Sequence, residues 1–286
     1  MLEDWAGAPL FVRDAHRVAL TAAGLAFRPI AHEILRRMVA ARDQIRDAAQ
    51  VSSNTLRFAC TSVLSVSFFP DWLQRLETLN PMGVEVSLVT DNSAVGRERL
   101  MLQGDAQLLL CYHHVSAPTT LDPAYFESLD VGEDFLIPVS APDASNSNVP
   151  LHALPGSEVA PVDYLAFSHH SGIGRILAAT RASDATPVWL NTTFTAGMAI
   201  VLIAVARAGR GVAWLPSSLV DADLRLGRLV RSGDSAWDIP MLIRLFRPRA
   251  PQGAVTETFW STVANNLPEL VGAHNVVPPF TRRPSN

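Results

Sequence analysis

Residues 8–24 have the sequence APLFVRDAHRVALTAAG, and this stretch decides how the chain begins to fold. Two short apolar segments, Leu10-Phe11 and Val18-Ala19-Leu20, flank a charged tip, which is the pattern of a β-hairpin. Gly7 precedes the hairpin and is suited to end a short first helix. Thr21 follows it and is suited to cap a second helix, because its hydroxyl can accept a hydrogen bond from a first-turn amide. The stretch therefore predicts a helix, a basic hairpin and a long helix, in that order.

Helix, basic hairpin and long helix form the second half of a winged helix-turn-helix followed by a linker helix. The stretch resembles the end of the DNA-binding domain in LysR-type bacterial transcriptional regulators, with many matching positions at fixed spacing. The matching residues are Leu2, Glu3, Gly7, Leu10, Phe11, Arg13, Arg17, Val18, Leu20, Thr21 and Gly24. The resemblance implies that Arg13, His16 and Arg17 on the wing contact the DNA backbone, which positions a protein without reading the bases.

The resemblance also implies that the first helices and most of the recognition helix come before Leu2. Two expectations follow. Either the recorded start lies inside a longer chain, or the protein lacks its base-reading element and acts as an effector-binding dimerisation module. Base readout belongs, in both cases, to residues that this sequence does not contain.

Composition indicates a globular cytoplasmic protein. The chain has 286 residues, of which 48% are hydrophobic and 17% charged, so it can bury more than one core. Its formal net charge of −4 does not by itself indicate a nucleic-acid-binding protein. The sequence has no secretory signal and no apolar run long enough to span a membrane. Its two cysteines are expected to be reduced.

Residues 21–50 are expected to form one long amphipathic helix, with Pro29 either kinking it or marking its true start. Its apolar residues recur at steps of three and four: Phe27, Ile30, Ala31, Ile34, Met38, Ala41, Ile45 and Ala48. A stripe with no obvious partner in the same chain favours a seam between two copies in a homodimer or homotetramer, and packing on its own domain is the alternative. The polar residues 51–54 are a predicted hinge.

From residue 55 the pattern changes to strands alternating with helices, which predicts an α/β fold. Strands are expected at residues 56–60, 84–89, 106–111, 126–139, 164–167, 188–191, 212–215 and 241–246. Helices are expected at residues 69–79, 94–102, 174–182, 196–208 and 256–267. The family resemblance implies a two-lobed effector domain, similar to periplasmic solute-binding proteins. The expected divisions are a DNA-binding remnant (1–24), linker and hinge (25–54), lobe I (55–128 and 241–273), lobe II (129–240) and a disordered tail (274–286).

A ligand in such a domain lies where strands end and helices begin, because helix N-terminal amides offer free donors. The polar residues at these points are Thr61, Ser62, Ser65, Asn92, Ser93, Tyr112, His113, Ser168, His169, Ser171, Thr193 and Thr195, with Trp214 as a candidate cleft wall. Each hydroxyl taken singly is better explained as a helix cap. Together they favour a cleft for a small polar or anionic ligand.

Three short segments resemble the branch of the family that contains the hypochlorite-responsive regulator: residues 62–70, 168–175 and 211–216. An oxidant sensor of that kind could use Met198, since the sulfoxide is polar and disturbs apolar contacts. Core filling is the alternative role for this methionine. Cys60 and Cys111 end two neighbouring strands and form a candidate redox pair, although buried, inert thiols are the more common case.

Other classes of protein find less support. The pairs His113-His114 and His169-His170 lack the spacing of metal ligands, and no cofactor is expected. The sequence has no nucleophile elbow, phosphate loop or dinucleotide fingerprint, so an enzyme is not expected. A transporter's solute-binding protein shares the two-lobe fold, but should carry a signal peptide and no long amphipathic helix. The sequence therefore favours a LysR-type regulator that binds DNA and a small effector or senses an oxidant.

Overall fold

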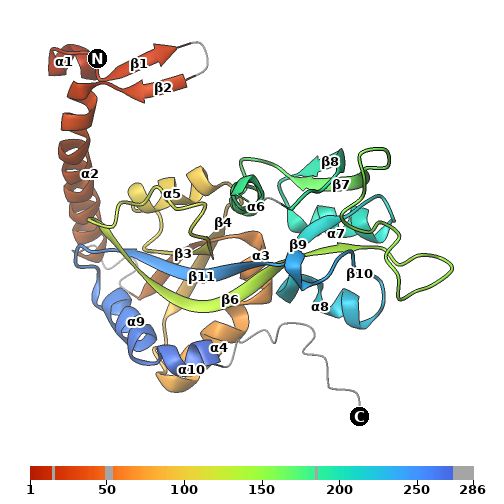
Figure 1. Cartoon of the computed structure of the whole chain (residues 1–286). Coiled ribbons are helices and arrows are strands. Elements are labelled where there is room, and N and C mark those ends of the chain that lie inside the picture. Colours follow the sequence, from red (N-terminus) through yellow and green to blue (C-terminus); the bar gives the residue numbers. More distant parts are fainter. Residues whose placement is uncertain (15–16, 49–53, 184–185, 273–286) are drawn as a thin grey trace.

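The computed structural model describes residues 1–14, 17–48, 54–183 and 186–272 (Figure 1). An N-terminal arm of helix, hairpin and long helix stands along one end of a two-lobed body. The arm consists of α1 (Leu2–Ala6), β1 (Phe11–Asp14), β2 (Arg17–Leu20) and α2 (Ala22–Ala48). The hinge residues 51–53 and the tail 274–286 lie outside the described residues.

The predicted hairpin and its caps are confirmed. Gly7 ends α1 with φ of 67°, in the left-handed region. The Thr21 hydroxyl accepts a hydrogen bond from the Gly24 amide (2.9 Å) and donates one to the Pro9 carbonyl (2.7 Å). A Cβ atom on Gly24 would lie 2.1 Å from the Leu10 carbonyl oxygen, so only glycine allows the hairpin to pack this closely against α2.

The helix α2 carries an exposed apolar stripe. Its large exposed members in the described part are Ile30, Ile34 and Met38, while Leu25 and Leu35 are exposed on other faces of the helix. The helix continues through Pro29, which therefore does not mark its start. The described part of the helix contacts the body where the His32 ring stacks on Tyr125, with centroids 4.9 Å apart.

The body is built on a seven-stranded mixed sheet in the order β10-β6-β11-β5-β3-β4, with β9 also pairing with β6. Its strands are β3 (Thr55–Cys60), β4 (Glu85–Thr90), β5 (Leu108–His113), β6 (Phe126–Ser140), β9 (Ala213–Pro216), β10 (Val230–Arg231) and β11 (Ile239–Pro248). A second sheet pairs β7 (Val162–Phe167) with β8 (Leu190–Ala196) in parallel. The helices are α3 (Ser62–Ser67), α4 (Phe69–Leu79), α5 (Ala94–Leu102), α6 (Gly172–Ser183), α7 (Ala199–Arg207), α8 (Ser217–Arg225), α9 (Ala254–Asn265) and α10 (Leu267–Gly272), with a short 3-10 turn, Ser235–Trp237.

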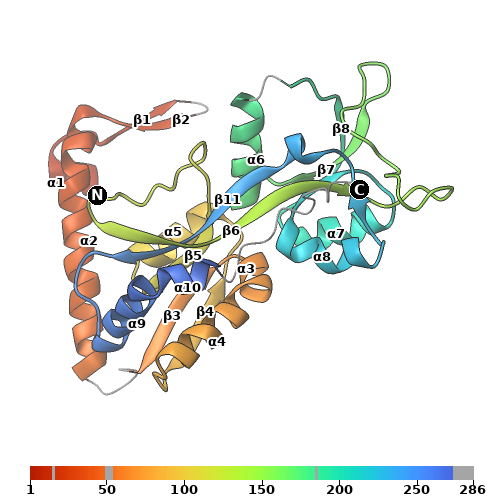
Figure 2. The same ribbon diagram turned by 60° about the horizontal axis from the view of Figure 1, so that its bottom comes forward.

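Two long antiparallel strands, β6 and β11, run from one lobe into the other (Figure 2). We call lobe I the part made of β3–β5, α3–α5, α9 and α10, and lobe II the part made of β7–β10 and α6–α8. In lobe I, β3 pairs in parallel with both β4 and β5, and β5 pairs antiparallel with β11. In lobe II, β6 pairs with β9 and β10. The predicted α/β two-lobed fold is confirmed.

Both faces of the lobe I sheet are covered. On one face Phe58 contacts Phe69 and Phe259, which brings α4 and α9 onto the sheet. On the other face Met101 of α5 packs with Leu109 in a smaller cluster. This alternation of buried residues along the strands fixes which side chains point toward α5, and so it positions the candidate site.

Candidate effector site between the lobes

The carboxyl ends of β3 and β4 meet the N-terminus of α6, and here lobe I contacts lobe II directly. The Asn92 carbonyl accepts a hydrogen bond from the Gly172 amide (3.1 Å), and the His170 carbonyl accepts one from the Ala94 amide (3.3 Å). Ser93 and Ser171 form an antiparallel bridge. The predicted residues of these three segments therefore come together as expected from the fold.

Most hydroxyls in this cluster are satisfied within the protein. Thr61 caps α3, Ser93 caps α5 and Ser171 caps α6, each accepting from a first-turn amide. Ser62 bonds the Asn92 side-chain oxygen through its amide (3.1 Å) and hydroxyl (2.9 Å). Ser65 donates to the Ser62 carbonyl, and Ser168 accepts from the His170 amide. Each of these hydroxyls thus has a structural bond of its own.

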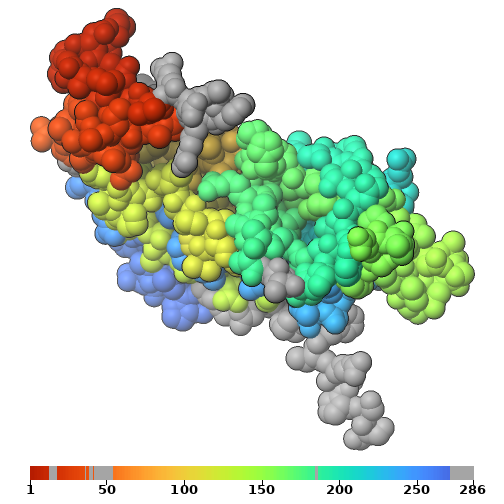
Figure 3. Space-filling model, turned by 45° about the horizontal axis from the view of Figure 1, so that its top comes forward, coloured from red at the N-terminus to blue at the C-terminus, as the bar shows by residue number. Residues whose placement is uncertain are grey.

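A small cavity of about 30 Å³ lies beside this junction, between α5 and β5 of lobe I and α6 of lobe II. Figure 3 shows α5 (yellow) next to α6 (green) at the surface. The lining residues are Ala94, Arg97, Glu98, Leu109, Cys111, Tyr112, His113, Ala117, Thr119, Gly172, Arg175 and Ile176. Tyr112 and His113 were predicted site residues, and the cavity brings them together with Arg97 and Arg175, which were not.

Arg97 is the most unusual group in the cavity. Arg97 is only 4% exposed, and its Nη1 donates a hydrogen bond to the Asp91 carbonyl (2.6 Å). Its Nε has no hydrogen-bond partner, and it forms no ion pair with any described residue. A Cβ atom on Gly172 would lie 2.6 Å from Arg97 Nη2, so the guanidinium lies directly against the start of α6.

The other charged groups of the cavity are already engaged. The Glu98 carboxylate accepts hydrogen bonds from the Thr119 hydroxyl (2.8 Å), the Thr120 amide (3.1 Å) and the Thr120 hydroxyl. Arg175 reaches from α6 across to the Pro118 carbonyl (3.1 Å), which gives a second contact between the lobes. A carboxylate satisfied in this way has fewer free positions for a further cation.

Three titratable side chains that line the cavity with Arg97, those of Cys111, Tyr112 and His113, are neutral at pH 7. Burial, with Arg244 nearby, lowers the pKa of His113. Burial raises the pKa of the Cys111 thiol to about 11 and that of the Tyr112 phenol well above its usual value. The charged side chains that line the cavity are therefore Arg97, Arg175 and Glu98, which together carry one excess positive charge.

A buried carboxylate lies where β6 passes from lobe I to lobe II. Asp134 is fully buried and accepts hydrogen bonds from Tyr112 of β5 and from Ser217 and Ser218 at the start of α8. Ser218 also bonds Ser67 at the end of α3 (3.2 Å). This network joins both lobes, and it explains why the Tyr112 hydroxyl is not free for a ligand.

Several predicted site residues lie elsewhere. Trp214 is buried in lobe II and donates its indole N–H to the Trp237 carbonyl (3.0 Å), so it does not form a cleft wall as expected. Thr193 and Thr195 lie exposed on β8, because that strand extends to residue 196, and they do not line the cavity beside Arg97. His169 is exposed and its ring lies against that of His170.

The two cysteines do not form a pair. Cys60 lies opposite Leu110 in the register of β3 and β5, so Cys111, one residue further, points to the other face of the sheet. Both thiols are free and buried, and burial raises the pKa of Cys60 to about 12. Met198, by contrast, is 45% exposed at the N-terminal end of α7.

The predicted DNA-backbone contacts cannot be placed. His16 lies outside the described residues, and so do the side chains of Arg13 and Arg17 on the hairpin strands.

Among the helices of the described residues, none combines the length and the apolar character that a membrane span requires.

Sequence reasoning missed Arg97, although a signal was present. Ala94, Arg97 and Met101 follow the i, i+3, i+7 spacing of one helix face, and both neighbours in this series are buried. An arginine on an otherwise apolar face indicates a buried cation. Asp134 gave no such signal, because its partner Ser217 in α8 lies more than eighty residues further along the chain.

Comparison with known proteins agrees with this architecture. The sequence model of the LysR substrate-binding domain matches residues 49–268. The chain is 24% identical to the HTH-type transcriptional regulator YjiE of Escherichia coli K12 over 261 residues, which are 91% of this chain and 80% of YjiE. It is also 24% identical to QseD, an HTH domain-truncated transcriptional regulator of E. coli O157:H7, over 84% of this chain and 93% of QseD.

Among solved structures, full-length HypT from Salmonella typhimurium, a hypochlorite-specific LysR-type regulator, shares the fold. The superposition covers 93% of this chain and 86% of the HypT chain, with a TM-score of 0.62 and 22% sequence identity. Since the domain match spans most of the chain, the chain belongs to the LysR family of transcriptional regulators.

Proposed function

We propose that the chain is a DNA-binding, ligand-responsive regulator in which residues 1–24 close the DNA-binding domain, 25–54 form the dimerisation linker and 55–273 form the effector domain, with lobe I at 55–128 and 241–273 and lobe II at 129–240. The observation that carries this proposal is the cavity between the lobes, which is lined by groups from both. A ligand that contacts both lobes biases their arrangement, which is what a regulator's effector must do.

The exposed stripe on α2 supports assembly into dimers. Ile30, Ile34 and Met38 expose large apolar side chains on one face of the helix, and such a face is stabilised by burial against a second copy. A dimer would place two hairpins at a fixed spacing, as the two half-sites of a regulator's DNA require. The proposal includes no catalytic step, and it places the protein in the cytoplasm with the chromosome.

The test is capture of sheared genomic DNA by the purified chain, followed by sequencing. We expect enriched fragments that share a two-fold site, and loss of both dimer and capture in the variant Ile34→Asp, Met38→Asp. Val159→Asp is the matched control, because Val159 is exposed on the body far along the chain from α2. Random fragments from a dimeric wild-type protein would contradict DNA-site recognition.

That contradicting result would favour a second function. The alignment with QseD covers 93% of a relative that is named for its truncated HTH domain. A dimer that binds effector but no DNA site would then act as an effector-binding dimerisation module. Oxidant sensing at Met198 is a further part of the proposal, supported by the exposure of its side chain.

A further inference from the structure

We propose that the cavity between the lobes is a binding site for one monovalent anion, or for the carboxylate of a larger effector, with Arg97 as its main ligand. The identification of that anion as the effector rests on the proposed function, whereas its binding does not. The site is distinct from the hydroxyl cluster at the ends of β3 and β4, where each hydroxyl already has a bond within the protein.

The first support is the state of Arg97. A buried guanidinium normally has a carboxylate partner, because removing an unpaired charge from water is costly. Arg97 has one bond, to a backbone carbonyl, and its Nε is unpartnered among the described residues. The one carboxylate that lines the cavity, Glu98, is instead bonded by Thr119 and Thr120. An anion in the cavity gives the guanidinium the negative partner that it lacks, on the side where Nη2 lies against Gly172.

The second support is that positive potential converges on the same small space. The guanidinium of Arg97 lies against Gly172, the first residue of the twelve-residue helix α6. A helix N-terminus carries a partial positive charge that disfavours a nearby cation unless an anion lies between them. Arg175 of α6 adds a second guanidinium from lobe II. His113, whose pKa is lowered, adds no charge at pH 7.

The third support is size. At about 30 Å³ the cavity holds roughly two water-sized groups, since one water needs about 10–15 Å³. That space suits a halide or a single carboxylate, and it excludes the whole of a larger metabolite. A larger effector would place only its carboxylate beside Arg97 and extend outward past Arg175, which is partly exposed.

The experiment measures chloride binding by the line width of the ³⁵Cl NMR signal, with the purified chain in a zwitterionic buffer to which sodium chloride is the only added salt. We expect protein-dependent broadening in the wild type, and binding at least tenfold weaker in Arg97→Gln. Arg99→Gln is the matched control, because it removes the same charge from an exposed position of the same helix. Two further variants test the site if Arg97→Gln does not fold. Arg97→Lys keeps the charge but loses the guanidinium, and Arg175→Gln removes the second cation. Each should weaken chloride binding severalfold.

Competition identifies the source of the anion. If formate displaces chloride and propionate does not, the ligand is a small free anion; if propionate displaces it at lower concentration than formate, the ligand is the carboxylate of a larger effector. Absence of broadening in the folded wild type, or equal broadening in folded Arg97→Gln, overturns the proposal. No DNA is used, so failed DNA capture with intact chloride binding would contradict only the proposed function.

Discussion

The hydroxyl of Tyr112 donates a hydrogen bond of 2.8 Å to Oδ2 of Asp134, and this bond joins lobe I to the strand that leads into lobe II. Asp134 is fully buried, and its carboxylate accepts hydrogen bonds from the hydroxyls of Tyr112, Ser217 and Ser218 and from the amides of Phe135 and Ser218. The bond is therefore part of what holds the two lobes in one arrangement.

Asp134→Ala should destabilise the protein by about 3–5 kcal/mol, because it leaves several buried donors without an acceptor. Tyr112→Phe removes a single donor to a charged acceptor and should cost about 1.5–3 kcal/mol. Both losses of unfolding free energy can be measured by urea denaturation monitored by circular dichroism. Equal losses for the two variants would mean that the carboxylate depends on Tyr112 alone.

Stability should fall as pH rises above about 9 because of the two buried thiols. The folded protein keeps Cys60 and Cys111 protonated up to pKa values of about 12 and 11, whereas the unfolded chain loses these protons near 9.0. The unfolded state thus binds fewer protons above pH 9, so each thiol lowers the free energy of unfolding by about 1.4 kcal/mol per pH unit there.

The double variant Cys60→Ala, Cys111→Ala tests this pH dependence. Its unfolding free energy should change much less than that of the wild type between pH 8.5 and 10.5. Tyr112 and Tyr164, whose pKa values are also raised, act in both proteins and only above about pH 10. Parallel pH profiles for variant and wild type would show that the thiols are accessible to water.

Gly24→Ala should loosen the hairpin from α2. The new Cβ atom would lie 2.1 Å from the Leu10 carbonyl oxygen, so the backbone must shift, at a cost of about 1–3 kcal/mol. Hydrogen exchange at residues 10–24 should become faster while exchange in the body is unchanged. Gly197→Ala is the control, since nothing lies within 4 Å of a Cβ atom there.

Hypochlorite at low dose should oxidise Met198 and Met38 several-fold faster than Met101 and Met241. The first two side chains are 45% and 65% exposed, and the last two are 2% exposed. Peptide mass spectrometry after a short exposure gives the four rates. A rate at Met198 as low as that at Met101 would remove it as a sensor candidate.

Local patterns were enough to predict the N-terminal arm and most elements of the body. The helix over residues 69–79 and the cap at Thr21 depend on neighbouring residues, so the sequence contains their cause. The short helix α3 was missed because SVLSVS has too few turns to show a period. The strand β8 was placed too early, since its exposed residues do not alternate.

The site was only partly predictable. Strand ends correctly indicated that Ser62, Asn92 and Ser171 converge, because parallel strands bring their carboxyl ends to one edge. The position of Trp214 was predicted wrongly, because an aromatic residue on a strand can face either a cleft or the core. The hydrogen bond from its indole N–H to the Trp237 carbonyl, which places it in the core, joins residues 23 positions apart. The missing partner of Arg97 is likewise a property of the folded surroundings and not of any sequence motif.

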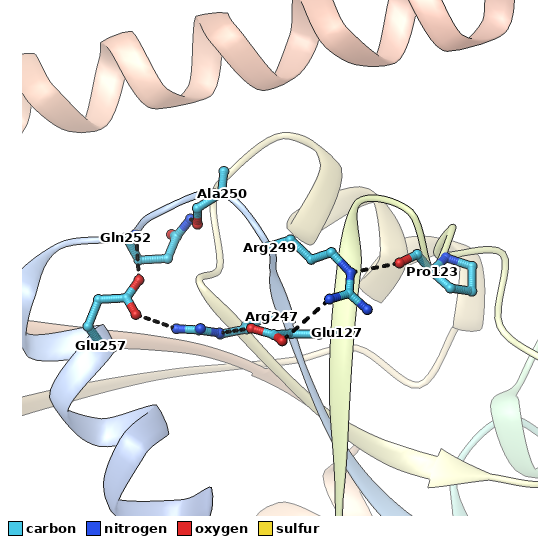
Figure 4. A network of polar contacts seen from close by, with 7 residues as sticks. All are labelled: Pro123, Glu127, Arg247, Arg249, Ala250, Gln252 and Glu257. Carbon is cyan, nitrogen blue, oxygen red and sulfur yellow. Dashed lines mark hydrogen bonds and ion pairs between the residues drawn. The ribbon is translucent and has the colours of Figure 1, made fainter.

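The continuity of β6 and β11 has a consequence for how a signal could travel. Both lobes share these two strands, which together form a ribbon, so rotating one lobe against the other must twist that ribbon. Its hydrogen-bond ladder is already interrupted by the register shift at Ile243–Arg244. At the far end, Arg247 of β11 bonds both Glu127 of β6 and Glu257 of α9, and Arg249 bonds Glu127 and the Pro123 carbonyl (Figure 4).

Arg249 also donates its amide to Tyr125, on which His32 of α2 stacks. A twist of the ribbon that moves Tyr125 would therefore disturb the ring contact that α2 makes through His32. Under the proposed function, this contact is where a change at the lobes would reach α2 and, through it, the hairpin.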